Sequence, residues 1–132
     1  MKTYTIHFIR CGLTEGNLKG QYIGSTDLEL CDKGRVDLRR LDHNMRYPGC
    51  AALISSPLKR CRETAEILYP AMKPIIIQEL RECDFGEIEG LTADELKDAK
   101  DFGLWRAADK DFTPYGGESG EHFSQRVCGA FE

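Results

Sequence analysis

A cysteine follows an arginine near the start of the chain, in the stretch IRCGLTEGN that covers residues 9–17. The apolar run before it predicts a strand, and Gly12 allows the backbone to turn directly after Cys11. The guanidinium of Arg10 favours the thiolate form of a neighbouring thiol, and a thiolate is a nucleophile. The stretch therefore places a candidate reactive group where a strand ends and a loop begins.

Each of three predicted strands is followed closely by an arginine, and these are Arg10, Arg60 and Arg81. Because ligands of open α/β sheets bind beyond the carboxyl ends of the strands, we expect the three guanidiniums to converge there. Converging guanidiniums, with free amides at a helix start and in a glycine-rich loop, suit a tetrahedral dianion such as phosphate or sulfate. Thr14 and Asn17 can add neutral donors. The alternative is that these arginines are ordinary surface charges.

Glu82 comes directly after Arg81. A carboxylate beside an anion site is unfavourable unless it holds a proton, because like charges repel. A protonated carboxyl group suits a general acid that delivers a proton to a leaving alkoxide. The alternative is a loop carboxylate paired with Arg81, and for Glu87 and Glu89 we prefer this structural interpretation.

Three strands must position these groups, and β-branched, apolar composition predicts them over residues 3–9, 51–55 and 74–78. The third is apolar enough to be buried on both faces. Acid-rich residues 79–91 and glycine-rich residues 113–120 are expected to be loops.

Four helices are predicted by apolar residues at helical spacing or by capping signals. One contains Leu38, Leu41 and Met45 and stops at the YPG of residues 47–49. The next starts at Ser56-Pro57, with the hydroxyl at the N-cap and proline at the first helical position. Its apolar face carries Leu58, Cys61, Ala65 and Leu68. A capping box of Thr92 and Glu95 starts a third helix, and a last one buries Phe123, Val127 and Phe131.

The alternation of strands and helices predicts an α/β fold with a mostly parallel sheet flanked by helices. The 132 residues suffice for one domain, residues 1–132. The last helix reaches Glu132 with no terminating glycine or proline and no strand after it, so the expected domain is incomplete at its C-terminal end. Apolar surface left uncovered there would favour oligomers.

Composition excludes several classes of function. The formal net charge is −4 and basic residues form no long run, which argues against nucleic-acid and membrane-surface partners. The N-terminal apolar run is short and carries His7, so we expect no secretory signal and a cytoplasmic location. No apolar run approaches the ~18 residues of a membrane span.

Six cysteines raise the question of metal or disulfide chemistry, namely Cys11, Cys31, Cys50, Cys61, Cys83 and Cys128. None lies in a C-x-x-C pair and only three histidines accompany them, so we predict no metal site and no cofactor. Without a secretory signal a disulfide framework is not expected either. Apart from Cys11, the cysteines are interpreted as reduced small hydrophobic residues.

Four stretches together resemble the successive motifs of the histidine phosphatase superfamily, which contains the phosphoglycerate mutases. They are FIRCGLTEGN, SSPLKRCRETAE, LRECDFGEIEGLT and GGES, and the resemblance runs from Ile6 to about Val127. The segment between Glu82 and the GGES of residues 116–119 is short. In this the chain is more similar to the phosphatase branch, with its alpha-ribazole and broad-specificity phosphatases, than to the mutases.

The resemblance implies a phosphoglycerate mutase-like fold and a two-step displacement on a phosphomonoester. A histidine in an R-H-G motif attacks phosphorus, and water then hydrolyses the phosphohistidine. By resemblance Arg10 and Arg60 hold the phosphoryl oxygens, Asn17 and Thr14 assist, and Glu82 is the proton donor. A second histidine, in an S-H-G motif after a later strand, completes the pocket in the family.

The chain departs from this pattern in three places. Cys11 stands where the nucleophilic histidine belongs, Leu13 stands where a Glu or Gln is favoured, and no S-H-G motif is present. His7 lies about 13 Å along the predicted strand from position 11 and cannot substitute. His43 and His122 fall on predicted helices.

Cys11 is a poor match to known cysteine phosphatases. Those enzymes hold the thiol in a C-x5-R cradle, and here Asn17 has the place of that arginine. A phosphate positioned for histidine would lie about 2 Å too far from the sulfur, when attack needs about 3–3.5 Å.

We therefore expect a phosphomonoester phosphatase whose turnover is impaired by Cys11 and by the missing second histidine. The alternatives are a phosphate-binding pseudoenzyme with an interaction or sensing role, a Cys11-dependent phosphatase, and a redox-responsive thiol protein.

Overall fold

Two short parallel strands lie among the helices of the chain. The computed structural model describes residues 1–99, 102–103, 113 and 116–132. Strand β1 (Ile54–Ser55) pairs with β2 (Ile75–Ile76), with Ile54 opposite Ile75 and Ser55 opposite Ile76. The crossover between them is helix α3 (Lys59–Leu68), which packs against β1. This strand–helix–strand unit confirms the small parallel sheet with helices.

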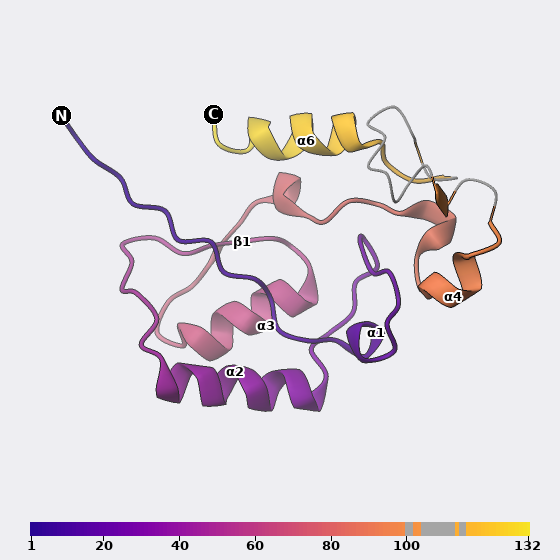
Figure 1. Ribbon diagram of the computed structural model, residues 1–132. Coiled ribbons are helices and arrows are strands. Elements are labelled where there is room, and N and C mark those ends of the chain that lie inside the picture. The colour runs from indigo at the N-terminus through magenta and orange to yellow at the C-terminus, as the bar shows by residue number, and fades with distance from the viewer. Residues whose placement is uncertain (100–101, 104–112, 114–115) are drawn as a thin grey trace.

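The remaining elements surround this unit, as Figure 1 shows. They are the helices α1 (Glu15–Leu18), α2 (Asp32–Asn44), α4 (Ala93–Leu96) and α6 (Gly120–Gly129), with the 3-10 turns η1 (Gln78–Leu80) and η2 (Gly86–Ile88). Helix α2 packs on α3, and α6 packs on η1. In this view α2 and α3 lie below the strand pair and α6 lies above it.

The core lies between α2 and α3. Leu30, Leu38 and Leu68 are buried against one another, with Tyr69 and Tyr47 packed at their edge. Arg35 of α2 also forms an ion pair of 3.1 Å with Glu63 of α3. The predicted helix around Leu38 is thus confirmed, and its end at Asn44 agrees with the stop signal at residues 47–49.

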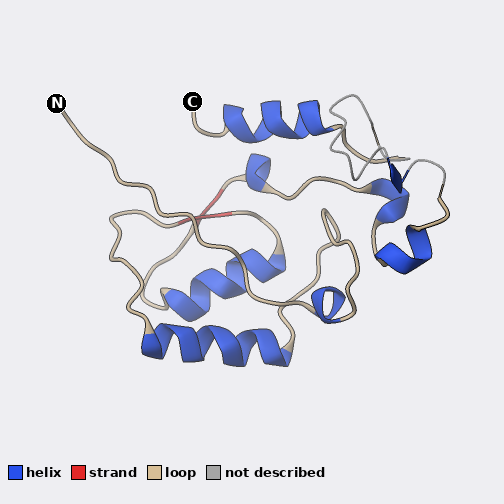
Figure 2. Cartoon of the chain, in the orientation of Figure 1, coloured by secondary structure: helices blue, strands red, loops and turns tan. Residues whose placement is uncertain are grey.

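The predicted first strand is wrong: residues 3–9 are drawn as loop in Figure 2. A strand needs a neighbour that pairs with its backbone N–H and C=O groups. No hydrogen bond among the described residues involves residues 1–10. The apolar side chains of Tyr4, Ile6 and Phe8 are accordingly exposed.

The predicted burial of the third strand is also wrong. Strand β2 covers only two residues of the expected range, and Ile75 is 57% exposed. In the described part of the chain β2 pairs only with β1, so its other edge has no partner strand. The last helix is also less buried than predicted, because Phe123 and Val127 are half-buried and Phe131 is 56% exposed.

The start of α3 differs from the prediction. The N-cap is Leu58 and not Ser56, and the helix begins at Lys59. The Lys59 N–H donates to Oδ1 of Asp27 at 2.7 Å, so a distant carboxylate caps this helix. The Ser56 hydroxyl accepts from the Leu58 N–H only at 3.5 Å, within the turn before the helix. The predicted apolar face is correct, with Leu58, Ala65 and Leu68 buried, although Cys61 is only half-buried.

The other capping signals are confirmed in the described residues. Thr92 and Glu95 form the predicted capping box at the start of α4. Residues 79–91 are loop with two 3-10 turns, as expected. Of the predicted loop 113–120, residues 114–115 lie outside the described residues, and the rest is loop up to the Ser119 N-cap of α6. No helix in the described ranges is long and apolar enough to cross a membrane.

Candidate active site

A cavity of about 250 Å³ lies where the first loop meets the start of α3. The residues that line it come from residues 10–23, from α3 and from the loop after η1. They are Arg10, Cys11, Gly12, Leu13, Thr14, Asn17, Ile23, Arg60, Cys61 and Glu82. All of the predicted site residues except Arg81 therefore share one cavity.

Cys11 is held in place through its neighbour Gly12. The Gly12 N–H donates to Oγ1 of Thr64 at 3.0 Å, and that hydroxyl donates to the Arg60 carbonyl at 2.7 Å. A Cβ at position 12 would come within 2.7 Å of Cδ1 of Leu38. The absence of a side chain at Gly12 thus lets the loop pack closely against Leu38 of α2, while the hydrogen bond to Thr64 of α3 brings Cys11 beside Arg60.

Arg60 is buried, with 6% of its surface exposed. Its Nη1 donates to the Thr26 carbonyl at 2.9 Å and its Nη2 to the Gly24 carbonyl at 2.7 Å. The guanidinium thus ties the loop of residues 24–26 to the start of α3. It also forms part of the cavity wall, so one side chain fixes the loop and supplies positive charge.

Glu89 binds the backbone N–H groups of the same loop. Its carboxylate accepts hydrogen bonds from the Gly24 N–H at 2.9 Å, the Ser25 N–H at 2.8 Å and the Thr26 hydroxyl at 2.7 Å. Burial raises the pKa of Glu89, but these bonds and one from Phe85 outweigh burial and lower it overall. The structural role predicted for Glu89 is confirmed, but its partner is this loop and not Arg81.

Thr14 and Asn17 form the capping box of α1. The Thr14 N–H and hydroxyl both donate to Oδ1 of Asn17 at 2.9 Å. Thr14 is fully buried, and its hydroxyl proton is already used in this contact. Among the described hydrogen bonds none uses Nδ2 of Asn17, so this amide is the donor that the pair can offer to the cavity.

Glu82 lies in the extended segment that follows η1. Its Oε1 accepts a hydrogen bond from the Cys83 N–H at 2.8 Å. Arg81, the preceding residue, does not line the cavity, and its Nη1 donates to the Gln78 carbonyl at 3.3 Å. The structure thus brings Arg10 and Arg60 together at the cavity without Arg81.

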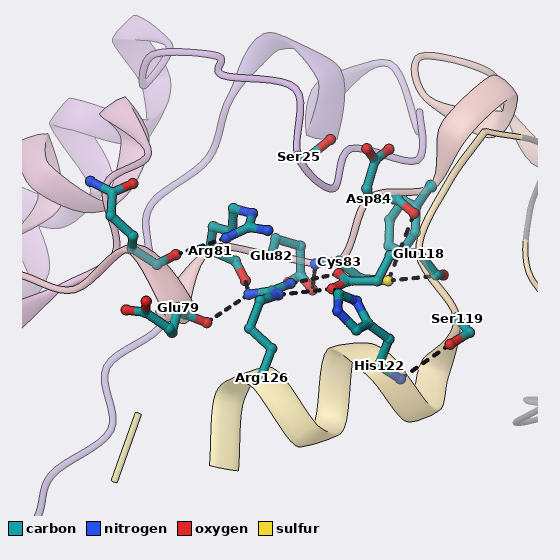
Figure 3. Close-up of polar contacts among 12 residues, drawn as sticks. Ser25, Glu79, Arg81, Glu82, Cys83, Asp84, Glu118, Ser119, His122 and Arg126 are labelled. Carbon is teal, nitrogen blue, oxygen red and sulfur yellow. Dashed lines mark hydrogen bonds and ion pairs between the residues drawn. The ribbon is translucent and has the colours of Figure 1, made fainter. Parts of the chain in front are cut away.

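Arg126 of α6 braces the segment that carries Glu82, as Figure 3 shows. Its Nη1 donates to the carbonyls of Glu79 at 2.6 Å and Arg81 at 3.0 Å. Its Nε and Nη2 form a bidentate ion pair with the Glu118 carboxylate, at 2.8 and 2.6 Å. Both side chains of the pair are over nine-tenths buried. Helix α6 thus fixes the backbone on the N-terminal side of Glu82.

Glu118 is held by further contacts. His122 Nδ1 lies 2.7 Å from its carboxylate, and the Glu118 N–H donates to the Asp84 carbonyl at 2.8 Å. The hydrogen bonds from Arg126 are the main cause that lowers the pKa of Glu118 to about 2. Glu118 therefore carries its negative charge through the whole neutral range.

Cys11 and Cys61 meet in the cavity. Hydrogen bonding from Cys61 is the main cause that lowers the pKa of Cys11 to about 6, while burial opposes it. The charges of Arg60 and Arg10 lower the pKa of Cys11 further. The contact with Cys11, together with burial, raises the pKa of Cys61. The two shifts favour the thiolate form of Cys11 and the thiol form of Cys61.

Several residues of the site were not predicted from the sequence. The apolar spacing of α3 predicts Cys61 on the buried face of the helix, whereas its place next to Arg60 is the signal that puts it at the same sheet edge. Thr64, Arg126 and Asp27 act through contacts over long sequence separations, for which the sequence carries no local signal. No group of three His, Cys, Asp or Glu side chains within the described residues could hold a metal ion.

Comparisons with known proteins identify the family of the chain. Residues 6–132 match the model of the histidine phosphatase superfamily (branch 1). The chain is 30% identical to a 2,3-bisphosphoglycerate-dependent phosphoglycerate mutase of Mesorhizobium japonicum, over 93% of this chain and 64% of that protein. It is 29% identical to an adenosylcobalamin/alpha-ribazole phosphatase of Salmonella typhimurium, over 90% of this chain and 61% of that protein.

A solved structure shows the same fold. The crystal structure of the protein TTHB049 from Thermus thermophilus is similar to this chain with a TM-score of 0.77 and 36% sequence identity, covering 93% of this chain and 68% of that one. The phosphoglycerate mutase-like fold is thereby confirmed. The chain spans 64% and 61% of the lengths of the two relatives from Mesorhizobium and Salmonella.

Proposed function

Because the chain belongs to branch 1 of the histidine phosphatase superfamily, we propose that its cavity binds the phosphoryl group of a small-molecule phosphomonoester. The observation that carries this proposal is the convergence of Arg10, Arg60, Cys11 and Glu82 on one cavity. Two guanidiniums in one concave site favour a dianion, because charge-assisted hydrogen bonds to phosphate are strong.

Each side chain has an assigned role in this proposal. Arg10 is exposed and lines the cavity, and it binds phosphoryl oxygens together with the positive charge of the buried Arg60. Asn17 adds a neutral donor and Thr14 orients it. Glu82 is the proton donor for the leaving alkoxide. Arg81 lies outside the cavity lining, so we assign it to the part of the substrate beyond the phosphoryl group.

Cys11 makes hydrolysis slow in this proposal. It stands at the position of the family nucleophile, and a cysteine sulfur reaches less far than the distal nitrogen of histidine. No histidine occurs among the described residues that line the cavity. A lost charge-stabilising donor costs about 10²–10³ in rate. The chain is then a phosphatase with impaired turnover, or a phosphate-binding pseudoenzyme if turnover is nil.

One observation favours Cys11-dependent hydrolysis as a second candidate. The thiolate is the nucleophilic form of cysteine, and the pKa of Cys11 is lowered to about 6. A thiolate beside two guanidiniums is an activated nucleophile, although the Arg60 guanidinium already binds the carbonyls of Gly24 and Thr26. The two candidates differ in what alkylation of Cys11 does.

Hydrolysis of an aryl phosphate tests both candidates. We expect almost no turnover by the native chain and weak but measurable turnover by Cys11→His, because histidine restores reach to phosphorus. Cys11→His combined with Glu82→Gln should lose that gain. Robust hydrolysis by the native chain, abolished by alkylation of Cys11, would instead establish the cysteine-dependent reaction. If Cys11→His binds phosphate but shows no gain in turnover, the result would favour the phosphate-binding pseudoenzyme.

A further inference from the structure

Two thiols of this cavity come from segments far apart in the sequence. Cys11 lies in the loop at residues 10–14, and Cys61 lies in the first turn of α3. The hydrogen bonds from the Gly12 N–H to Thr64 and from Thr64 to the Arg60 carbonyl hold these two segments together. Both cysteines are half-buried, so small reagents can reach them through the cavity mouth.

The surroundings assign different roles to the two sulfurs. Cys11 faces the guanidiniums of Arg60 and Arg10, while Cys61 hydrogen-bonds Cys11. An attacking thiolate and a neighbouring thiol that can replace an oxygen on the attacked sulfur are the two parts of a reactive cysteine pair. Phosphoryl transfer needs neither Cys61 nor a second thiol, so this arrangement lies outside the function proposed above.

The other cysteines lack this arrangement. Cys31 caps α2 by accepting the Gly34 N–H, and Cys50 contacts Met72. The thiol of Cys83 contacts the carbonyls of Asp84 and Glu118, and burial with nearby acids raises its pKa to about 11. Cys128 is exposed on α6. Cys11 and Cys61 are the cysteines that share the cavity described above.

We propose that Cys11 and Cys61 are a redox site, in which a hydroperoxide oxidises the pair to an intramolecular disulfide within the lining of the cavity. The Cys11 thiolate attacks one oxygen of the hydroperoxide, an S–O bond forms and the O–O bond breaks. Sulfur is oxidised by two electrons, and the peroxide leaves as an alcohol or water after taking one proton. The product on Cys11 is a sulfenic acid.

The second step joins the two cysteines. The Cys61 sulfur attacks the Cys11 sulfur, the S–S bond forms and the S–O bond breaks, and hydroxide leaves as water with the proton of Cys61. In sum, two thiols and one hydroperoxide give a disulfide, one alcohol and one water. A dithiol reductant reverses the change by thiol–disulfide exchange. While the disulfide persists, the thiolate is absent from the cavity.

Peptide mapping of the oxidised protein tests the pairing without any substitution. The reduced chain is treated with one equivalent of hydrogen peroxide, quenched by alkylation, digested without reductant and examined by mass spectrometry. We expect one dominant cross-linked product that joins the peptides of Cys11 and Cys61. It should disappear after dithiothreitol. Linked peptides dominated by any other pair, or no intramolecular link at all, would overturn the proposal.

Two variants test the assigned roles. In Cys61→Ser the cross-link should be lost and a dimedone adduct should accumulate on Cys11, because the sulfenic acid has no thiol to resolve it. The matched control Cys83→Ser should form the Cys11–Cys61 link as the native chain does. Equal loss of the link in Cys83→Ser, or no dimedone adduct on Cys11 in Cys61→Ser, would contradict the assignment.

Discussion

Arg60 shows how one side chain can combine structural and chemical roles. Its guanidinium binds the carbonyls of Gly24 and Thr26 and also lines the cavity. The sequence places Arg60 at the sheet edge correctly, because a turn signal follows the strand before it. It cannot show that two of the donors of Arg60 are already used, since those contacts span more than thirty residues. For this reason Arg10, which is exposed, is the better residue for a binding test.

Cys11 should titrate at unusually low pH. The pKa of Cys11 is lowered to about 6, chiefly by hydrogen bonding from Cys61. We expect the rate of alkylation of Cys11 by iodoacetamide to reach half its maximum near pH 6, against about pH 8.5 for an ordinary thiol. Peptide-resolved mass spectrometry measures this rate for each cysteine.

A control and a variant make this measurement decisive. Cys83 should remain slow throughout the neutral range, because its pKa is raised to about 11. In Cys61→Ala the largest cause of the shift is removed, so the midpoint of Cys11 should move to higher pH. An unshifted midpoint in this variant would show that Cys61 does not stabilise the thiolate.

Helix α3 is capped by a residue that is distant in the sequence, and not by the local capping signal before it. Ser56-Pro57 predicts the start of α3 two residues too early, because the Asp27 carboxylate binds the Lys59 N–H. In contrast, the capping box of Thr92 and Glu95 is correctly predicted, since both partners lie within one turn. Local capping chemistry can be predicted from the sequence, and caps supplied by a distant loop cannot.

Substitution at Asp27 distinguishes the observed cap from the predicted one. Asp27→Ala should lower the free energy of unfolding by about 1 kcal/mol, the usual value of an N-cap carboxylate. Ser56→Ala should cost clearly less, because its contact with the Leu58 N–H is 3.5 Å long. Chemical denaturation measures both values. A larger loss in Ser56→Ala than in Asp27→Ala would restore the cap predicted from the sequence.

The Arg126 brace should contribute more than any surface ion pair. Arg126→Ala leaves the buried Glu118 carboxylate without its main partner and frees the carbonyls of Glu79 and Arg81. Breaking a buried pair costs about 3–5 kcal/mol, and we expect the lower end of this range by chemical denaturation. Gln125→Ala, on the exposed face of α6, should change stability by less than about 0.5 kcal/mol. Equal effects of the two changes would contradict the brace.

The same ion pair predicts a pH dependence of stability. The pKa of Glu118 is lowered to about 2, so folding favours its ionised form. Its contribution is complete above the ordinary glutamate pKa of about 4.3 and is lost as the pH falls from there toward 2. Thermal melts of the native chain should therefore lose stability over this range more steeply than those of Arg126→Ala. Parallel curves would show that Glu118 does not gain its stabilisation from Arg126.

At the scale of the whole molecule, the sequence predicts the fold family better than the extent of the sheet. Four motifs in order place the chain in its superfamily, and the site residues gather because the loops converge on α3. The strand predicted over residues 3–9 is absent and Ile75 is exposed, since pairing partners cannot be inferred from local composition. Tyr4, Phe8 and Ile54 are exposed as well, so the described part of the chain leaves apolar surface uncovered, as expected.

If Arg10 and Arg60 make the cavity a phosphoryl site, a calorimetric titration with inorganic phosphate under reducing conditions should detect binding that depends on them. The native chain should bind phosphate at one site. Arg10→Ala should weaken binding by about ten- to a hundredfold, because a charge-assisted hydrogen bond contributes about 1.5–3 kcal/mol. Arg62→Ala, an exposed arginine of the same helix as Arg60 and outside the cavity lining, should bind phosphate as the native chain does. Equal affinity of Arg10→Ala and the native chain would show that Arg10 does not bind phosphate and that the cavity is not the phosphoryl site.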